Sequence, residues 1–352
     1  MAAPPQVAIR ADASARIGHG HVMRGLALAA ALRARGAIVH VLQRRDAGDA
    51  RAAVERAGCI AHAWPADAAR DASDFAAADA AATRDVLRRI GRPDWLVLDH
   101  YRLGADWVHA LRRDVGRVLV VDDLADRAHD GDLLLDSNWH DDPAARYRGR
   151  WPTGRPALFG PAHALLRPEF AAARAARGPR DGGVRRIVVA FGGSDPAGAT
   201  GACVEALHAA RPDLRLDVIV GAGASQAAAL QQRWAGHPQV QVTVGASDVT
   251  TRFAAADLFV GAGVSMTWER ACLELPGVTL PVAENQRPLC RRLHEAGLSI
   301  DLGPWHVGAP AALPDALARL TADPARCRAM SRGLAELCDG QGAGRVAATL
   351  LI

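Results

Sequence analysis

The sequence predicts an α/β protein built from two open parallel sheets, each packed against helices. Short apolar runs alternate with helical runs through nearly the whole chain, as repeated β-α-β units do. This alternation stops once, in an Ala/Arg/Gly/Pro-rich stretch at residues 171–183, and then restarts. A chain of 352 residues is also long for a single core. We therefore expect a Rossmann-like domain at residues 1–170 and another at 184–352, with the final helix free to return to the first.

The first domain opens with an extended run and a helical run, and this alternation continues to its end. The strands are expected at 6–10, 37–42, 59–63, 95–98, 117–121, 132–136 and 156–159. The helices between them are expected at 21–35, 47–57, 71–90 and 104–114. Each strand is a short apolar run, and each helix carries apolar residues at helical spacing.

The second domain repeats the alternation and then ends in helices. Its strands are expected at 186–191, 215–220, 239–243, 257–261 and 277–281. Its helices are expected at 197–210, 224–234, 248–255, 265–274 and 286–296. The tail at 309–351 is helical, with breaks near Asp323-Pro324 and Gly340–Gly344. If the carboxyl edges of the two sheets face each other, they form a cleft suited to a small molecule.

Composition narrows the function classes. The net charge of +4 comes mostly from scattered arginines, without a basic block, so no nucleic-acid partner is indicated. The six cysteines include no Cys-x-x-Cys pair, which favours reduced thiols and no zinc site. No apolar run is long enough for a signal peptide or a membrane span. We expect a cytoplasmic protein with a small-molecule substrate; composition does not indicate its oligomeric state.

The segment Ile17-Gly18-His19-Gly20-His21-Val22-Met23-Arg24 joins the first strand to the first helix. Gly18 and Gly20 allow a tight turn and a close approach to a ligand. His21 then falls at the mouth of a helix, at the carboxyl edge of the sheet, where it can exchange a proton near neutral pH. Two alternatives stay open: an ordinary Gly-x-Gly turn, and a histidine that caps the helix. Met23 stands where a dinucleotide fingerprint needs its third glycine, so an NAD site is disfavoured.

Polar residues follow three other strand ends in the first domain. They are Asp12-Ala13-Ser14, Asp99-His100-Tyr101 and Asp122-Asp123. Carboxylates at such positions can orient a histidine or stabilise positive charge. Aspartates that cap loops are an equally good explanation for each of them.

Glycine loops follow two strands of the second domain. Gly192-Gly193-Ser194 can offer backbone N–H groups to a phosphate, together with the start of the next helix. Gly263-Val264-Ser265 precedes a helix whose Glu269 can reach the hydroxyls of a ribose, and Asn285-Gln286 offers amides. Plain turns, a favourable first-turn carboxylate and helix capping are the structural alternatives. The second domain contains no Gly-Lys-Ser/Thr loop and no Asp-x-Asp pair, so a metal-bridged diphosphate is not indicated there.

Together these motifs resemble the hydrolases that cleave UDP-2,4-diacetamido-2,4,6-trideoxy-β-L-altrose in pseudaminic acid biosynthesis, relatives of MurG-type glycosyltransferases with the two-domain GT-B fold. The matching segments run through nearly the whole chain: Arg10–Asp12, Ile17–Arg24, Asp99–Tyr101, Asp122–Leu124, Ala164–Phe170, Phe191–Pro196, Gly261–Glu269 and Asn285-Gln286. The resemblance implies that His21 is the catalytic base and that Glu269 binds the ribose. His19, between the two glycines, departs from the family pattern.

The resemblance implies catalytic roles for His21, Asp99 and Tyr101. It implies substrate contacts from Asp12, Gly18, Gly20, Arg24, Gly192, Gly193, Ser194, Gly263, Val264, Ser265, Glu269, Asn285 and Gln286. The implied reaction is an inverting hydrolysis of the UDP-sugar by C–O cleavage, without metal or cofactor. A glycosyltransferase that uses a UDP-sugar and a non-catalytic nucleotide-sugar binding protein are the alternatives.

Overall fold

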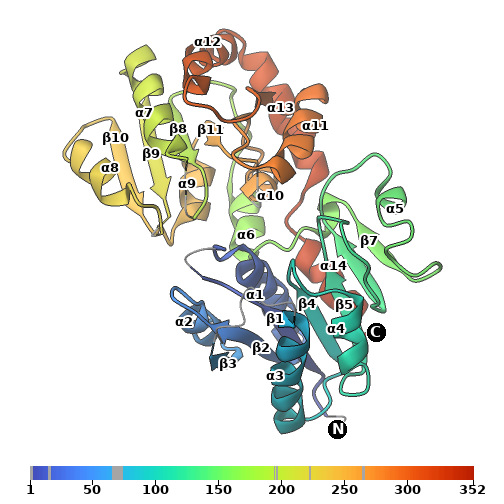
Figure 1. The fold of residues 1–352 in the computed structure, drawn as a ribbon. Coiled ribbons are helices and arrows are strands. Elements are labelled where there is room, and N and C mark those ends of the chain that lie inside the picture. The colour runs from blue at the N-terminus through green and yellow to red at the C-terminus, as the bar shows by residue number, and fades with distance from the viewer. Residues whose placement is uncertain are drawn as a thin grey trace. The chain divides into compact units, whose positions relative to one another are not determined.

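The structure is a computed structural model that describes residues 3–14, 17–65, 74–193, 195, 197–221, 223–263 and 266–352. The chain divides into two compact units. One comprises Met1–Pro168 together with Gln341–Ile352, and the other comprises Glu169–Gly340. In each unit, parallel strands form an open sheet with helices packed on its faces (Figure 1).

The first unit contains a seven-stranded sheet in the order β3-β2-β1-β4-β5-β6-β7. Its strands are β1 (Gln6–Ala11), β2 (Ile38–Arg45), β3 (Ile60–Pro65), β4 (Trp95–Asp99), β5 (Arg117–Val121), β6 (Leu133–Asp136) and β7 (Ala157–Phe159). All neighbouring strands pair in parallel. The strand order reverses at β1, which lies between β2 and β4. The loops that leave β1 and β4 therefore diverge at the carboxyl edge, where open α/β sheets bind their ligands.

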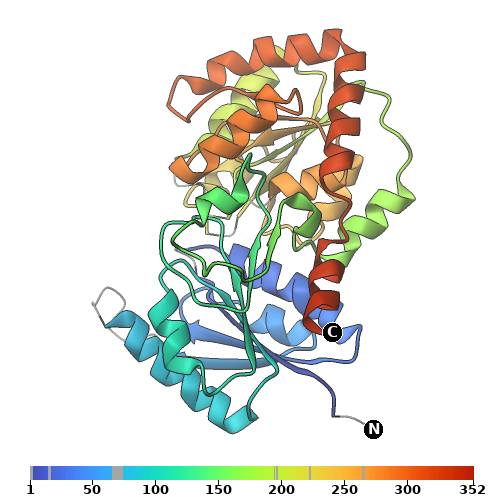
Figure 2. The ribbon, with the colours of Figure 1, turned by 90° about the vertical axis from the view of Figure 1, so that its right-hand side faces the viewer.

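Helices cover both faces of this sheet. They are α1 (Gly20–Arg33), α2 (Arg51–Arg56), α3 (Phe75–Ile90), α4 (Ala105–Leu111), α5 (Pro143–Arg146), the 3₁₀ turn η2 (Pro161–His163) and α14 (Gly342–Leu350). One buried cluster joins α1 and α14 to the sheet, and another joins α3 and α4 to the opposite face. A Cβ at Gly25 would lie 3.2 Å from the Ile9 side chain, so α1 packs closely on β1. Figure 2 shows α14, at the red end of the chain, beside α1.

The second unit contains a six-stranded sheet in the order β10-β9-β8-β11-β12-β13. Its strands are β8 (Arg186–Ala190), β9 (Arg215–Val220), β10 (Val240–Val244), β11 (Leu258–Gly261), β12 (Gly277–Thr279) and β13 (Ile300–Asp301). Its helices are α6 (Pro168–Ala176), α7 (Ala199–Ala210), α8 (Ala227–Arg233), α9 (Val249–Ala255), α10 (Met266–Cys272), η3 (Glu284–Gln286), α11 (Arg287–Glu295), η4 (Ala309–Ala312), α12 (Leu313–Ala322) and α13 (Pro324–Leu337). The order reverses at β8, which lies between β9 and β11.

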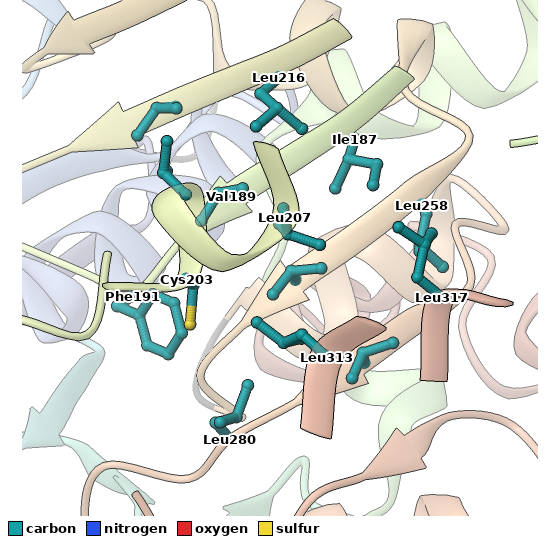
Figure 3. Close-up of a cluster of buried hydrophobic side chains, with 14 of the residues drawn as sticks. Ile187, Val189, Phe191, Cys203, Leu207, Leu216, Leu258, Leu280, Leu313 and Leu317 are labelled. Carbon is teal, nitrogen blue, oxygen red and sulfur yellow. The ribbon is translucent and has the colours of Figure 1, made fainter. Parts of the chain in front are cut away.

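The core of the second unit lies between its sheet and two helices from distant parts of the chain. Strand residues such as Ile187 and Leu258 face Leu207 of α7 and Leu313 and Leu317 of α12 (Figure 3). All five side chains are at most 2% exposed. Burial of apolar surface at this density is the main stabilising contribution to such a sheet.

The prediction of two open parallel sheets is confirmed, and each strand expected from the sequence is present within a few residues. Helix α6 extends to Ala176 and buries Phe170, so the first half of the boundary stretch at 171–183 is helical. Its alanines favour a helix, and Pro168 occupies the first helical position, where it costs no hydrogen bond. The two-residue strand β13 and the short α5 were not expected. Residues 341–352 belong to the first unit, and the predicted helix start at 71–73 lies outside the described residues.

A histidine pair between β2 and β3 should make stability depend on pH. His40 Nδ1 lies 3.0 Å from His62 Nε2. Burial lowers the pKa of both rings, and for His62 the neighbouring His40 and Arg89 add to the effect. The unfolded chain, whose histidines titrate near 6.5, therefore binds more protons below that pH than the folded chain does. Stability contributed by the neutral pair is present above about pH 6.5 and is lost as the pH falls.

We expect the urea midpoint of unfolding to fall between neutral pH and about pH 5.5. Because other groups titrate in the same range, the comparison is with His62→Gln, which should flatten this dependence. An equally steep fall in His62→Gln would show that the pair does not cause it.

Candidate functional site

The loop after β1 places His21 at the beginning of a helix. Ser14 and Gly18 exchange backbone hydrogen bonds of 2.9 and 3.3 Å, which close the loop. Gly18 has a φ of 77°, a left-handed conformation that favours glycine. Helix α1 then begins at Gly20, so His21 lies in its first turn at the carboxyl edge of the sheet. His19 occupies the N-cap position just before the helix. Its side chain is exposed and makes no capping hydrogen bond.

His21 is paired with the carboxylate at the end of the neighbouring strand. Asp99 ends β4 in register with Ala11 of β1, and its Oδ1 lies 2.6 Å from His21 Nδ1. Arg24, one turn further along α1, donates to both carboxylate oxygens, from Nε at 2.5 Å and Nη2 at 2.6 Å. Although Asp99 is only 2% exposed and burial opposes ionisation, Arg24 and His21 hold its pKa well below the ordinary value.

This environment selects one tautomer of His21. An ionised carboxylate only accepts hydrogen bonds, so Nδ1 of His21 carries the proton and donates it to Asp99. Nε2 is then the basic nitrogen of the ring. A neutral imidazole oriented by a carboxylate in this way is suited to remove a proton from a hydroxyl group.

Asp123, just after β5, extends the same network. Its Oδ2 accepts from Arg24 Nη1 at 2.9 Å and from the Tyr101 hydroxyl at 3.3 Å. The Tyr101 ring meets the His21 ring edge-on, with centroids 4.4 Å apart. Burial and the charge of Asp123 raise the pKa of Tyr101, which therefore remains a neutral phenol. Arg24 directs its N–H groups at Asp99 and Asp123, and its expected contact with substrate stays a prediction.

A cavity of about 320 Å³ opens beside His21. Its lining residues come from the carboxyl end of β2, from the loops after β1, β2 and β4, and from the starts of α1 and α3. They are Asp12, Ala13, Ser14, Ile17, His21, Arg44, Asp46, Phe75, His100, Tyr101 and Arg102. Arg44, Phe75 and Arg102 were not expected at a site, yet all three line this cavity. Arg44 could have been found from its position at the carboxyl end of a predicted strand.

Asp12 lies in the cavity wall, but its carboxylate is already well paired. Arg10 donates to its two oxygens at 2.5 and 2.9 Å, and the backbone N–H of Arg44 donates at 2.7 Å. Although Asp12 is buried, Arg10 and His100 hold its pKa well below the ordinary value. His100 Nδ1 accepts from the backbone of Arg102 at 3.0 Å, and burial lowers the pKa of this ring. Asp12 lines the cavity with both carboxylate oxygens hydrogen-bonded within the chain, and its expected contact with substrate stays a prediction.

A larger cavity, of about 470 Å³, lies in the second unit at the amino ends of β8, β9 and β10. Arg186, Arg215 and Trp234 are among its lining residues, and none of the predicted site residues is. Ligands of open α/β sheets bind at the carboxyl edge. We therefore place the candidate site at the smaller cavity, which is lined by His21, the partner of Asp99.

The loop after β8 differs from the anion site expected there. Gly192 has a φ of 100°, and a Cβ at Gly221 would lie 1.9 Å from the Gly193 carbonyl oxygen, so the loops after β8 and β9 pack tightly. Asp195 accepts hydrogen bonds from the backbone N–H groups of Ala199 at 3.0 Å and Thr200 at 2.9 Å. These are the donors that the start of α7 would otherwise offer to a phosphate. Two of the N–H groups at this helix start are therefore used within the chain, and the anion site at the glycine loop stays a prediction.

The other predicted residues of the second unit lie in or beside two loops. Gly263 follows β11, and Glu269 is half-buried in α10. Asn285 is exposed, whereas Gln286 is buried and its Oε1 accepts from the Val282 backbone at 3.0 Å. One oxygen of Gln286 thus stabilises its own loop. Ser194, Val264 and Ser265 lie outside the described residues.

Gly263 should not tolerate a side chain unless Cys290 is shortened. A Cβ at Gly263 would lie 2.1 Å from Cys290 Sγ but 3.8 Å from Cys290 Cβ. Gly263→Ala should therefore destabilise the protein by roughly 1–3 kcal/mol, as overpacking usually does. Cys290→Ala in the same chain should restore most of this loss, as measured by urea unfolding of both single variants and the double variant. Additive effects would contradict the clash.

No protein-family model and no curated protein matches the chain. Solved structures do match over its whole length. MurG of Acinetobacter baumannii superposes with a TM-score of 0.67 and 14% identity over 99% of each chain. A UDP-glucosyltransferase from Polygonum tinctorium, capable of glucosylating indoxyl, gives 0.69 and 14% over 100% of each chain. The kitacinnamycin glycosyltransferase gives 0.64 and 19% over 99% of each chain.

These structures share the fold of glycosyltransferases with two Rossmann-like domains, and this chain has the same GT-B fold. The fold expected from the sequence is confirmed. In the part of the chain that the structure describes, no helix is long and apolar enough to cross a membrane. Nor do the described histidines, cysteines and acidic residues form a group that could hold a metal ion.

Proposed function

We propose that this protein is an enzyme that transfers a sugar from a UDP-sugar to a hydroxyl group, with His21 as the catalytic base. The observation that carries this proposal is the His21–Asp99 pair, at 2.6 Å, beside a cavity at the switch point of the first sheet. The GT-B fold supports it, because the compared structures include MurG and a UDP-glucosyltransferase.

The proposed step is a single displacement at the anomeric carbon. The acceptor oxygen forms a bond to this carbon while the bond from the carbon to the diphosphate oxygen breaks, and its electron pair leaves with UDP. His21 Nε2 takes the proton of the attacking hydroxyl, and the ionised Asp99 stabilises the resulting imidazolium. Attack from the face opposite UDP inverts the anomeric configuration. We assign no metal or cofactor to this step.

The proposal assigns nucleotide binding to the second unit. Backbone N–H groups around Gly192, Gly193 and Ser194, and around Gly263, Val264 and Ser265, would stabilise the diphosphate charge. Glu269 would bind the ribose hydroxyls, and Asn285 and Gln286 would supply amide contacts. The position of the two glycine loops supports this assignment. One follows β8 and the other follows β11, on either side of the switch point of the second sheet.

Hydrolysis is the second candidate function, with water as the acceptor. His21, Asp99 and Tyr101 carry the resemblance to UDP-sugar hydrolases. The observation in favour of hydrolysis is that His21 and Tyr101 line one cavity and that Asp99 pairs with His21. The donor would then be UDP-2,4-diacetamido-2,4,6-trideoxy-β-L-altrose. The base, the inversion and the leaving group would be the same.

Product analysis tests both candidates. A panel of UDP-sugars is incubated with the protein in ¹⁸O-labelled water, with and without acceptors that carry a hydroxyl, and the products are measured by mass spectrometry. Transfer predicts that UDP release depends on the acceptor, with a product heavier by the sugar. Hydrolysis predicts free sugar labelled at the anomeric hydroxyl and unlabelled UDP. Binding of UDP without any UDP release would overturn both in favour of a binding protein.

Replacing Glu269 by alanine tests the nucleotide assignment separately. UDP affinity should fall by roughly 1–3 kcal/mol, as for a lost hydrogen bond between a charged group and its partner. KM for the UDP-sugar should rise, while turnover at saturation should change less. Glu205→Ala, which removes an exposed carboxylate paired with Arg233 on the same unit, is the matched control. Unchanged UDP affinity by calorimetry would remove Glu269 from the ribose site.

A further inference from the structure

Arg44 lies in the wall of the cavity that contains His21. It lies near the carboxyl end of β2, the strand beside β1, and its backbone N–H is held by Asp12 at 2.7 Å. Its guanidinium lies over the ring of Phe75, 4.9 Å from the centroid. The guanidinium of Arg102 lies over the same ring at 3.9 Å. Both arginines and the phenylalanine line the cavity, which therefore has a cationic wall on an aromatic support.

The charge of Arg44 has no carboxylate partner among the described residues. Asp12 is bound by Arg10, and Asp46, which lines the same cavity, has other partners. Arg44 is half-buried, so part of the water that would solvate its charge is excluded. A guanidinium in such a position gains from binding an anion, which replaces the lost solvation.

We propose that Arg44 binds an anionic group, a carboxylate or a phosphate, of the acceptor molecule. The inference rests on the proposed function, because it assigns the cavity beside His21 to the acceptor. Guanidinium groups offer a planar set of N–H donors that matches both anions. Contact with Phe75 restricts the Arg44 side chain before the ligand arrives, which lowers the entropic cost of binding.

The size of the cavity limits the part of the acceptor that enters it. A volume of about 320 Å³ is near the lower end for ligand sites, and suits one sugar ring rather than an extended molecule. The acceptor, or the end of it that enters the cavity, is therefore about the size of one sugar ring and carries an anionic group. Its hydroxyl would meet His21 while its anionic group meets Arg44.

Binding of small probes to the full chain tests this inference without requiring turnover. Glucose, glucuronate and glucose 6-phosphate share a ring and differ in charge, so their affinities are compared by ligand-observed NMR or calorimetry. We expect at least one anionic probe to bind about tenfold or more tightly than glucose, with a preference that weakens as salt is added. The two anionic probes distinguish a carboxylate site from a phosphate site.

Two arginine variants make the test specific. Arg44→Gln should reduce binding of the anionic probe to the level of glucose, and Arg44→Lys should retain part of the preference. Arg45→Gln removes the same charge one residue later on β2, where side chains alternate between faces, and should leave the preference intact. Equal binding of glucose and both anions, no binding of any anion, or an unchanged preference in Arg44→Gln would overturn the inference.

The failure of this inference is distinguishable from failure of the proposed function. If anionic probes bind through Arg44 but no UDP-sugar is turned over, the anion site stands and the enzymatic proposal fails. If transfer occurs equally to neutral and acidic acceptors, and the probes show no preference, the enzyme stands and the anion site fails.

Discussion

His21→Ala is expected to lower turnover of the UDP-sugar by about two to four orders of magnitude, the range typical of a lost general base. The reason is that Asp99, held ionised by Arg24, keeps the proton of His21 on Nδ1 and leaves Nε2 as the base. UDP affinity should stay close to that of the unchanged chain, because nucleotide binding is assigned to the second unit. Steady-state kinetics and calorimetry with UDP measure the two quantities.

His19→Ala is the matched control for this prediction. His19 lies two residues earlier in the same glycine loop and is exposed, so its loss should leave turnover nearly unchanged. A folded His21→Ala protein with near-normal turnover would remove His21 as the base. A comparable loss in both variants would instead indicate that the loop, rather than one imidazole, is responsible.

Asp99→Asn should lower turnover by about two orders of magnitude or more, because an amide neither stabilises the imidazolium nor selects the tautomer of His21. It also removes the charge that Arg24 contacts through Nε and Nη2. The effect should fall mainly on kcat, and the acidic limb of the pH–activity profile should move to lower pH. A merely structural role of Asp99 would lower the thermal midpoint without moving that limb.

Asp123→Asn distinguishes the roles of the two carboxylates that Arg24 contacts, Asp99 and Asp123. Asp123 accepts from Arg24 Nη1 at 2.9 Å and from Tyr101 at 3.3 Å, and no hydrogen bond joins it to His21 among the contacts described. Its replacement should therefore cost less turnover than Asp99→Asn and should leave the acidic limb in place. Equal losses in the two variants would contradict the assignment of Asp99 as the residue that orients His21.

Part of the candidate site could be predicted from the sequence. The turn at Gly18 and the position of His21 at the start of a helix follow from local preferences of glycine and from the apolar pattern of α1. Asp99 could be placed at the end of a buried strand, because it follows the short apolar run of β4. These predictions depend on neighbours along the chain, which the sequence displays directly.

The partners of these residues could not be predicted in the same way. His21 and Asp99 are 78 positions apart, and they meet because β1 and β4 are adjacent and in register at their carboxyl ends. The order β1-β4-β5 likewise brings Asp99 and Asp123 within reach of Arg24. An apolar strand pattern does not specify which strands are neighbours, so contacts between side chains on different strands remain undetermined until the sheet forms.

Most strands, most helices and the glycine turns of this protein could be predicted from the sequence alone, because each depends on local backbone preferences and on the period of apolar residues. Three features that bear on function depend instead on how the elements pack. Asp195 occupies the N–H groups at the start of α7, Arg44 enters the cavity beside His21, and α14 packs against α1 of the first unit. Each of these contacts joins residues through the order of the strands or the path of the chain. A buried polar group or apolar face pairs with the partner that this arrangement brings within reach.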